Sequence, residues 1–270
     1  MSGATKGIDR RLLLTLGAAT LVSACSSHVS AQQSSSGSSG ATTADTTADT
    51  TAQPGSSLSS SPSCRPPSKA ELNHTAPLDH LPCNGADIAL TIDDGPHQLW
   101  TPQVLELLDH LAIPATFCVV GQQAKKLPRL VADVVAAGHQ LANHTYTHAA
   151  LRQAKAGTVA VEIERAQDAI LTATAGRGTP TLFRAPGGGW SPTVLGEVAA
   201  RGMRPLGWSL DPRDWSRPGV PAIVAAITTG VRPGSIILEH DGGGDRSQTV
   251  AALTEVLPRL LDQGYRFVLP

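Results

Sequence analysis

Residues 87–96 read DIALTIDDGP, and this stretch indicates the fold class of the chain. The short, mainly apolar run at 88–92 is typical of a buried strand. Asp93 and Asp94 close that strand, and a Gly-Pro pair then turns the chain. Consecutive strand residues point to opposite faces, but a turn at the strand end lets both carboxylates reach one pocket. For the dipeptide alone, an Asx-type turn that caps the next helix is the competing interpretation.

Further short apolar runs follow the first, and patterns with apolar residues three and four apart separate them. The expected strands are 88–92, 115–120, 140–142, 181–183, 204–208, 235–238 and 266–269, and the expected helices are 102–111, 127–137, 159–175, 192–201, 220–229 and 249–263. Gly138, Gly202 and Gly264 each stand between an expected helix and the next strand, as left-handed helix stops do. The alternation favours an α/β fold, a distorted or incomplete (β/α) barrel of about seven parallel strands. An open doubly wound sheet is the alternative, because periodicity does not show closure.

The N-terminal region has the pattern of an export signal. Arg10 and Arg11 precede an apolar stretch at 12–24, which is shorter than the roughly twenty residues needed to cross a bilayer. We therefore expect a signal peptide at 1–24 and not a membrane anchor. The arginine pair also fits a twin-arginine signal, although ordinary signals contain dibasic pairs too.

The next segments suggest an anchor, a tether and one domain. Val-Ser-Ala-Cys at 22–25 resembles the bacterial lipobox, which would make Cys25 the lipidated N-terminus on the outer face of the membrane, with secretion as the alternative. Residues 25–63 are rich in Ser, Thr, Ala and Gly and cannot bury a core, so we expect a flexible tether. The stretch 64–270 shows no second low-complexity break and predicts a single domain.

The charge balance argues against a nucleic-acid partner. The chain has 21 basic and 22 acidic residues, a formal net charge of −1, where a nucleic-acid-binding domain is typically basic. Such a surface suits an uncharged or weakly charged polymer, and a monomer is the default expectation. Cys64 and Cys83 could pair in an oxidising compartment. Cys118 lies within an apolar run and is expected to be a buried free thiol.

The stretch NHTYTH at 143–148 supplies candidate metal ligands. His144 and His148 are four apart, a spacing that would place both side chains on one face of a helical turn. With one carboxylate they could hold a divalent cation and leave positions open for water and substrate. The second carboxylate would remain free as a base. Taken alone, such a pair can also be a surface accident.

Polar residues follow the other expected strands as well. Arg184 opens RAPGGG at 184–189, and its guanidinium could hold a carboxylate in a fixed orientation. Gly187 offers a backbone N–H that could stabilise an oxyanion. A tight loop with an incidental arginine is the competing interpretation.

His240, in LEHD at 238–241, could act as a general acid with a neighbouring carboxylate to raise its pKa, or as a third metal ligand. Trp190, Trp208 and Trp215 lie close in sequence to these clusters and suggest an aromatic wall for sugar rings. Core packing is the alternative, and we expect it for Trp208 within its strand.

These clusters, in this order, resemble the polysaccharide deacetylase family, the chitin-deacetylase-like enzymes of carbohydrate esterase family 4, over roughly residues 87–269. The resemblance implies a distorted (β/α) barrel that uses a divalent metal to hydrolyse acetyl groups on sugars. It implies Asp94, His144 and His148 as the metal ligands. Zinc is the usual ion of the family, and cobalt, nickel or manganese also suit this donor set.

The resemblance also implies the catalytic roles. Asp93 would be the base that deprotonates the attacking water, and Arg184 would position Asp93. His240, tuned by Asp214, would protonate the leaving group, and the Gly187 N–H would hold the oxyanion.

Trp215 and Leu238 would line the pocket for the acetyl methyl group. Gly187 stands where an aromatic residue is common in the family, and Ile92 replaces the usual Phe. The first departure removes a platform and widens the cleft, so it bears on substrate preference.

We therefore expect an exported, metal-dependent hydrolase of the cell envelope. Its expected reaction removes N-acetyl groups from peptidoglycan or a chitin-like N-acetylglucosamine polymer. O-deacetylation of acetylxylan by the same site is the first alternative, and an inactive wall-glycan-binding protein is the second. The presence of every expected catalytic residue argues against the second.

Overall fold

The computed structural model describes residue 68, residues 75–82 and residues 84–270. The predicted signal peptide, Cys25, the tether, and both Cys64 and Cys83 lie outside the described residues, so those expectations stay predictions. Within the described ranges, no helix is both long enough and apolar enough to cross a membrane.

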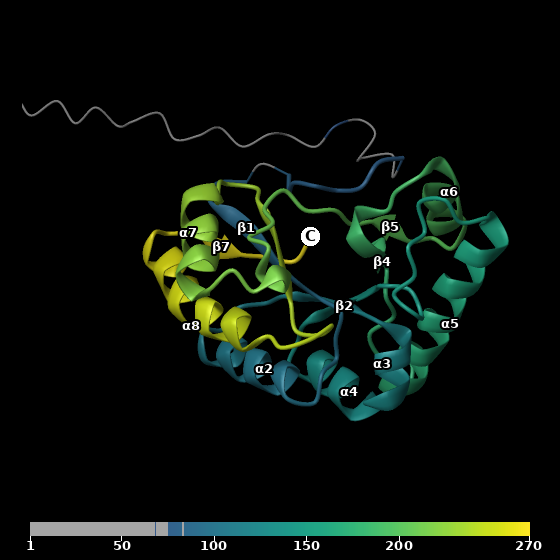
Figure 1. Cartoon of the computed structure of the whole chain (residues 1–270), viewed down its shortest axis with the longest axis horizontal. Coiled ribbons are helices and arrows are strands. Elements are labelled where there is room, and N and C mark those ends of the chain that lie inside the picture. Colours follow the sequence, from purple (N-terminus) through teal and green to yellow (C-terminus); the bar gives the residue numbers. More distant parts are fainter. Residues whose placement is uncertain (1–67, 69–74, 83) are drawn as a thin grey trace, which may run out of the picture. The chain divides into compact units, whose positions relative to one another are not determined.

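Seven parallel strands of the described chain form one sheet (Figure 1). Their order is β5-β4-β3-β2-β1-β6, and β7 pairs with β1. The strands are β1 (Asp87–Asp93), β2 (Thr116–Val119), β3 (Gln140–Asn143), β4 (Leu182–Phe183), β5 (Arg204–Pro205), β6 (Ile236–His240) and β7 (Arg266–Phe267). The predicted parallel arrangement is confirmed.

Single bridges join the two ends of the sheet. The described segment that precedes β1 pairs Leu78 with Leu206, next to β5, and His80 with Ser235, next to β6. The gap between the outer strands is therefore crossed by an isolated bridge on each side and not by a further strand. This arrangement is the distorted barrel that the strand and helix alternation predicted.

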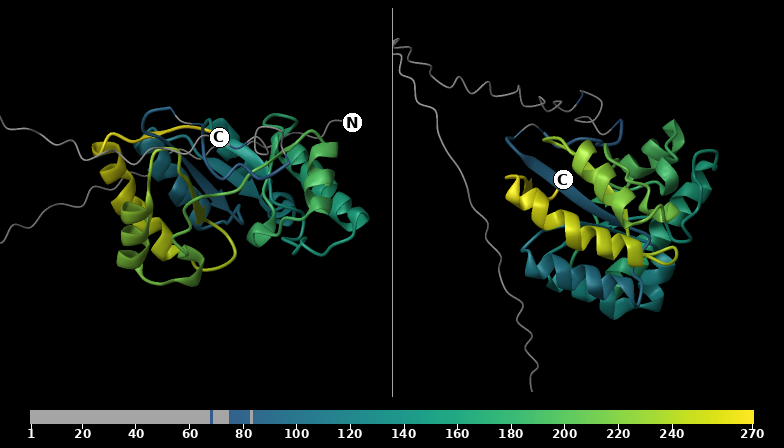
Figure 2. Two further views of the ribbon diagram at one scale, coloured as in Figure 1. Left: turned by 90° about the horizontal axis from the view of Figure 1, so that it is seen from above. Right: turned by 60° about the vertical axis from the view of Figure 1, so that its left-hand side comes forward.

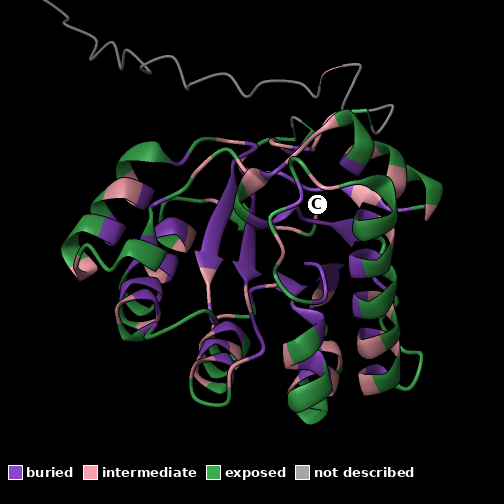
Figure 3. Ribbon diagram, turned by 45° about the vertical axis from the view of Figure 1, so that its right-hand side comes forward, coloured by how far each residue is buried: buried purple, intermediate pink, exposed green. Residues whose placement is uncertain are grey.

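Helices surround the sheet, and their outward faces are exposed while the strands between them are buried (Figure 3). They are α2 (Trp100–His110), α3 (Gly121–Lys126), α4 (Pro128–Ala136), α5 (Ala156–Thr174), α6 (Pro192–Ala200), α7 (Val220–Gly230) and α8 (Ser247–Asp262). Two short 3₁₀ turns, η1 (Pro186–Gly188) and η2 (Asp214–Ser216), lie in loops. All the predicted helices are present, with α2 and α8 packed side by side (Figure 2). Only α3 was not predicted, since six residues are too few for a periodic pattern.

The alternation of side chains along β1 separates the core from the site. Ile88, Leu90 and Ile92 belong to the largest apolar cluster, which includes residues of α2, α4, α7 and α8. Ala89 belongs to a second cluster, with residues of β2, β3 and β4. Because successive strand residues point to opposite faces, Asp93 shares the face of Ala89 and lies with that second group. Cys118 lies in the second cluster as a buried free thiol, as predicted.

Three details differ from, or refine, the predicted boundaries. β5 ends at Pro205, so Trp208 lies outside the strand in which we expected it. β6 extends to His240, so His240 lies within this strand and not after it. The predicted helix stops are confirmed, because Gly138, for example, has a φ of 84°.

Candidate active site

Asp93 and Asp94 reach one cleft because the backbone changes conformation between them. Asp93 is the last residue of β1 and is buried, with a relative exposure of 3%. Asp94 follows with a φ of 76°, in the left-handed region, which turns its side chain back toward the side of Asp93. The two carboxylates therefore serve one site, as the turn at the strand end predicted.

Arg184 holds the Asp93 carboxylate. It follows β4, is fully buried, and donates from Nη1 to Asp93 Oδ1 at 2.9 Å. The same guanidinium donates to Thr91 Oγ1 at 2.7 Å and to the Gly207 carbonyl at 2.7 Å. Thr91 and Asp93 lie on β1 and Gly207 in the loop after β5, so the arginine, which follows β4, joins the ends of these strands and fixes the orientation of Asp93.

His144 and His148 come together on a loop and not on a helical turn, which corrects the geometry we predicted for them. The loop follows β3, and Thr145 and His148 have φ values of 64° and 59°. The two rings nevertheless lie 5.0 Å apart. Their convergence results from two left-handed residues, not from helical periodicity.

Side chains of neighbouring elements hold this loop. Asn143 accepts from the Thr145 N–H at 3.0 Å and donates to a carbonyl of α5 at 2.9 Å. Glu162 of α5 accepts from the N–H groups of Tyr146 and Thr147 at 2.9 and 2.8 Å. Glu162 was not among the predicted residues, although a carboxylate on the apolar face of a predicted helix was a signal for it.

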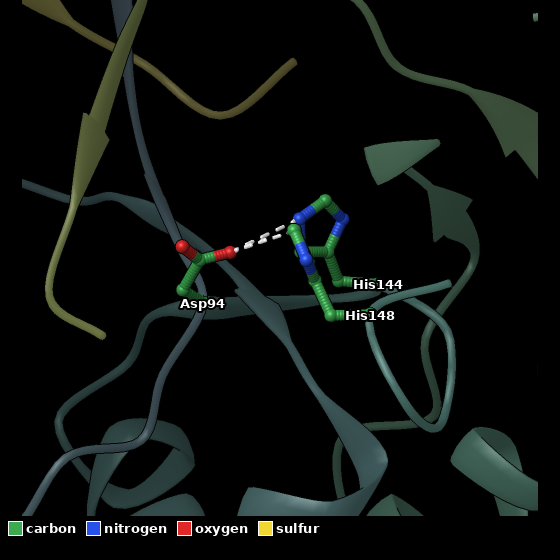
Figure 4. Close-up of side chains that lie close together, drawn as sticks. All are labelled: Asp94, His144 and His148. Carbon is green, nitrogen blue, oxygen red and sulfur yellow. Dashed lines mark ion pairs between the residues drawn. The ribbon is translucent and has the colours of Figure 1, made fainter. Parts of the chain in front are cut away.

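Asp94, His144 and His148 form a cluster with the geometry of a metal site (Figure 4). Asp94 Oδ1 lies 3.5 Å from His144 Nε2 and 3.1 Å from His148 Nε2. Ligand atoms about 2 Å from a tetrahedral ion are separated by roughly 3.3 Å, so these distances fit.

The orientation of the His144 ring and the charge of Asp94 also fit a cation. His144 Nδ1 lies 2.8 Å from the Arg184 carbonyl, to which it can only donate, so in the neutral ring it is Nε2 that faces Asp94 with a lone pair, as in a metal ligand. Burial raises the pKa of Asp94, but hydrogen bonds and charge from the two histidines outweigh it and hold this pKa far below its ordinary value. The pKa of His148 is raised, mainly by its hydrogen bond to Asp94. A carboxylate and two imidazole nitrogens thus converge as ligands do.

His240 and Asp214 form a second polar pair in the same cleft. His240 Nδ1 lies 2.7 Å from Asp214 Oδ1, and the His240 N–H donates to Oδ2 at 3.0 Å. Thr249 of α8 donates to the same Oδ2 at 2.7 Å. Burial opposes the charged form of His240, yet Asp214, Asp93 and Asp94 together raise its pKa above the ordinary value. Burial raises the pKa of Asp214, but the hydrogen bond and charge of His240 and the hydrogen bond from Thr249 together lower it.

One cleft of about 460 Å³ is lined by the ligand cluster and by His240 of the second pair. Its volume is within the size range of ligand sites. Among the predicted residues, Asp93, Asp94, His144, His148, Gly187, Trp215, Leu238 and His240 line it. Gly187 has a φ of 58° and open space where a Cβ would stand. A groove of about 400 Å³ between α3 and α5 is mainly apolar and contains neither pair, so we assign the site to the cleft.

Sequence reasoning missed part of the lining. Trp208, expected in the core, packs against the second apolar cluster and also lines the cleft, whereas Trp190 packs against Phe183 at 6.0 Å. The aromatic wall thus consists of Trp208 and Trp215. Gly243 and Arg246 also line the cleft, from the loop after β6. No motif indicated them, because only the return of that loop past Asp94 brings them in.

The sequence and the fold of this chain are similar to those of known proteins. The sequence model of the family described as "Polysaccharide deacetylase" matches residues 82–206. A chitooligosaccharide deacetylase of Sinorhizobium fredii is 45% identical over 188 residues, which cover 66% of this chain and 87% of that protein. A peptidoglycan-N-acetylglucosamine deacetylase of Bacillus cereus is 41% identical over 190 residues, covering 70% and 88%. A solved family 4 pseudoenzyme of Bacillus anthracis has a TM-score of 0.66 and 26% identity, covering 71% and 66%.

The last of these relatives shares the fold but is a pseudoenzyme, so the argument for turnover rests on the side chains of the cleft and not on the fold. Identity of 45% across 87% of a deacetylase, together with the expected barrel and the ordered polar clusters at its strand ends, is sufficient to assign the family. This chain belongs to the polysaccharide deacetylase family, carbohydrate esterase family 4.

Proposed function

We propose that this protein is a metal-dependent hydrolase that removes N-acetyl groups from an N-acetylglucosamine polymer outside the cell. The observation that carries the proposal is the meeting of two polar groups in one cleft, a ligand cluster at Asp94 and an acid pair at His240. A reaction that needs both an activated water and a protonated leaving group requires this combination.

Asp94, His144 and His148 would hold the divalent ion. Zinc suits one carboxylate and two imidazoles, and cobalt, nickel and manganese accept the same donors. A bound ion would supply Lewis-acid polarisation of the acetyl carbonyl and a lowered pKa for the attacking water.

Asp93 is suited to accept the proton of that water. Its Oδ1 is held by Arg184, and its Oδ2 lies 3.7 Å from His144 Nε2, on the side of the ligand cluster. The buried guanidinium stabilises the ionised carboxylate and prevents its rotation. Asp93 therefore presents one oxygen to the cleft as a general base.

His240 is suited to protonate the leaving amine. Asp214 holds Nδ1–H, so Nε2 faces the reaction with its proton when the ring is charged, and the raised pKa favours that form near neutrality. The Gly187 N–H would stabilise the developing oxyanion, and Leu238 with Trp215 would contact the acetyl methyl group.

The relatives support the proposed substrate, and the sequence of the N-terminal region supports the proposed location. The two deacetylases above act, by name, on chitooligosaccharide and on peptidoglycan N-acetylglucosamine. Export, with a lipid on Cys25 and a tether at 25–63, would place the domain beside the wall, which favours peptidoglycan. Acetylated glycan is then the only partner that we propose besides the membrane, and the domain would act as a monomer.

The test is acetate release from N-acetylglucosamine oligomers by the purified domain, with chelator and then with zinc restored. We expect release that is lost to chelation and recovered with metal, and Asp93→Asn should abolish it. Asp211→Asn is the matched control, because it removes a carboxylate of the same cleft that does not belong to the cluster and is not the hydrogen-bonding partner of His240. Release from acetylxylan alone would support the esterase, and no release with metal bound would support the glycan-binding alternative.

A further inference from the structure

Glu239 is a buried carboxyl group beside the acid pair that the mechanism above does not use. It precedes His240 in β6 and has a relative exposure of 0%. Both of its carboxyl oxygens are buried and receive no hydrogen bond from the described residues. A buried polar group without a partner is rare and calls for an explanation.

The groups around Glu239 are mainly acidic. Asp214, which accepts from the N–H of the adjacent His240, contributes the largest acidic effect on the pKa of Glu239, and Asp211 adds a further negative charge. Arg246 supplies a positive charge near it, but its Nε and Nη1 donate to the carbonyls of Gly242 and Trp215. No ion pair between Arg246 and Glu239 is present among the described residues.

An ionised Glu239 would be poorly tolerated at this position. A carboxylate removed from water without a donor is strongly disfavoured, and a second carboxylate beside it adds repulsion. Burial first, and the charge of Asp214 second, raise the pKa of Glu239 well above its ordinary value. A protonated carboxylic acid avoids both penalties, because it is neutral and its O–H can donate a hydrogen bond to Asp214.

We propose that Glu239 is a neutral carboxylic acid that donates a hydrogen bond to Asp214 and thereby positions the partner of His240. Asp214 would then accept from four donors: the His240 N–H, His240 Nδ1, Thr249 Oγ1 and Glu239. The role of His240 as the acid rests on the proposed function. The hydrogen bond from Glu239 does not.

This contact should adjust the proton affinity of His240. Each hydrogen bond that Asp214 accepts withdraws charge from the carboxylate and weakens its attraction for the imidazolium. Glu239 would therefore keep the pKa of His240 below the value that Asp214 alone would produce. A general acid with a pKa close to the working pH is the useful result. Glu239 is thus a positioning residue that acts through Asp214.

Two variants of similar size separate donation from packing. Glu239→Gln keeps the shape and an N–H donor for Asp214, whereas Glu239→Met keeps the volume and removes the donor. Glu255→Gln, on the exposed face of α8, is the matched control for a glutamate-to-glutamine change. We expect the pKa of His240 to be unchanged in the Gln variants and raised by about 0.5–1 unit in Glu239→Met.

The experiment uses the zinc-loaded protein and two spectroscopic measurements that do not depend on turnover. Infrared difference spectra between wild type and Glu239→Gln at neutral pH should contain the carbonyl band of a protonated carboxylic acid. Titration of ¹³C-labelled histidines, with His240→Asn to assign the signal, gives the pKa of His240 in each variant.

Two results would overturn the inference. One is a carboxylate band in place of the protonated acid. The other is a pKa of His240 that falls in both Glu239→Gln and Glu239→Met, because both would then have removed a negative charge. If these measurements agree with the proposal while acetate release is absent, the proposed function fails and the Glu239 contact stands.

Discussion

Replacing Asp214 with Asn tests the acid pair directly. The variant keeps the shape of the side chain but removes its charge and one of its two acceptor oxygens. In wild type, Asp214 Oδ1 lies 2.7 Å from His240 Nδ1, and Asp214 Oδ2 accepts hydrogen bonds from the His240 N–H and from Thr249 Oγ1. An amide has only one oxygen for these three donors, so its NH₂ group must face a donor. The imidazolium form of His240 loses its closest counter-charge.

The expected size of the effect follows from that loss. Asp214 raises the pKa of His240 against the opposing effect of burial, so its removal should lower that pKa by about 1–3 units. This corresponds to roughly 1.4–4 kcal/mol at 1.36 kcal/mol per unit. A general acid acts in its protonated form, so activity is lost as the pH rises through its pKa. The alkaline limb of kcat/KM should therefore move to lower pH, and activity on that limb should fall by about 10- to 10³-fold, tenfold for each pKa unit.

The assay is the pH dependence of acetate release by wild type, Asp214→Asn and Asp211→Asn, with metal content measured for each. Asp211 lines the same cleft and is exposed, so its variant also removes one negative charge there but leaves Nδ1 of His240 with its partner. The reasoning is refuted if Asp214→Asn binds metal normally and keeps both its alkaline limb and a kcat within about threefold of wild type. An equal shift in the Asp211 variant would refute the specific hydrogen bond and leave only a general charge effect.

Three further predictions concern the ligands, the arginine and the buried acid. Asp94→Asn should lower the affinity for zinc by more than the roughly 10- to 100-fold that outer-shell changes cost, whereas Asp93→Asn should retain zinc and lose turnover. Equal zinc content of the two variants after dialysis would contradict these roles. Arg184→Met leaves the Asp93 carboxylate buried and unpaired, so it should cost about 3–5 kcal/mol and lower Tm by about 6–20 °C; a loss below 1 kcal/mol in urea unfolding would contradict it. Glu239 has a raised pKa when folded, so between about 4.5 and that pKa the folded state holds a proton that the unfolded state lacks, and stability falls as pH rises. Glu239→Gln removes this dependence, so its stability relative to wild type should grow with pH above about 4.5, and a difference that is flat with pH would argue for an ionised Glu239.

The fold could be predicted because its elements are periodic and bounded by clear stops. The amphipathic patterns placed α2, α4, α5, α6, α7 and α8 within a few residues of their observed ends. What they could not show is how the sheet closes. That depends on isolated bridges such as the one between Leu78 and Leu206, which involve no periodic pattern.

The candidate site was predicted where its residues stand at strand ends, and missed where they come from the surroundings. Asp93 and Arg184 were expected to meet, and they do at 2.9 Å. The predicted geometry of His144 and His148 was wrong, since a four-residue spacing suggested a helical turn and the chain uses left-handed residues. Glu162, in the helix α5, shapes that loop through contacts that no local motif encodes.

The sequence by itself determined which groups the protein can use and the order in which the strands present them. Parallel strands end at one edge of the sheet, so carboxylates, imidazoles and a guanidinium placed after successive strands must come close together. Only the tertiary structure decided which of them touch and in what protonation state. The interior orientation of Asp93, the charge of Asp94 and the pairing of His240 with Asp214 depend on burial and on distances of about 3 Å between residues far apart in the chain. Such electrostatic effects depend on short separations and on exclusion of water, and a local sequence pattern predicts neither of them.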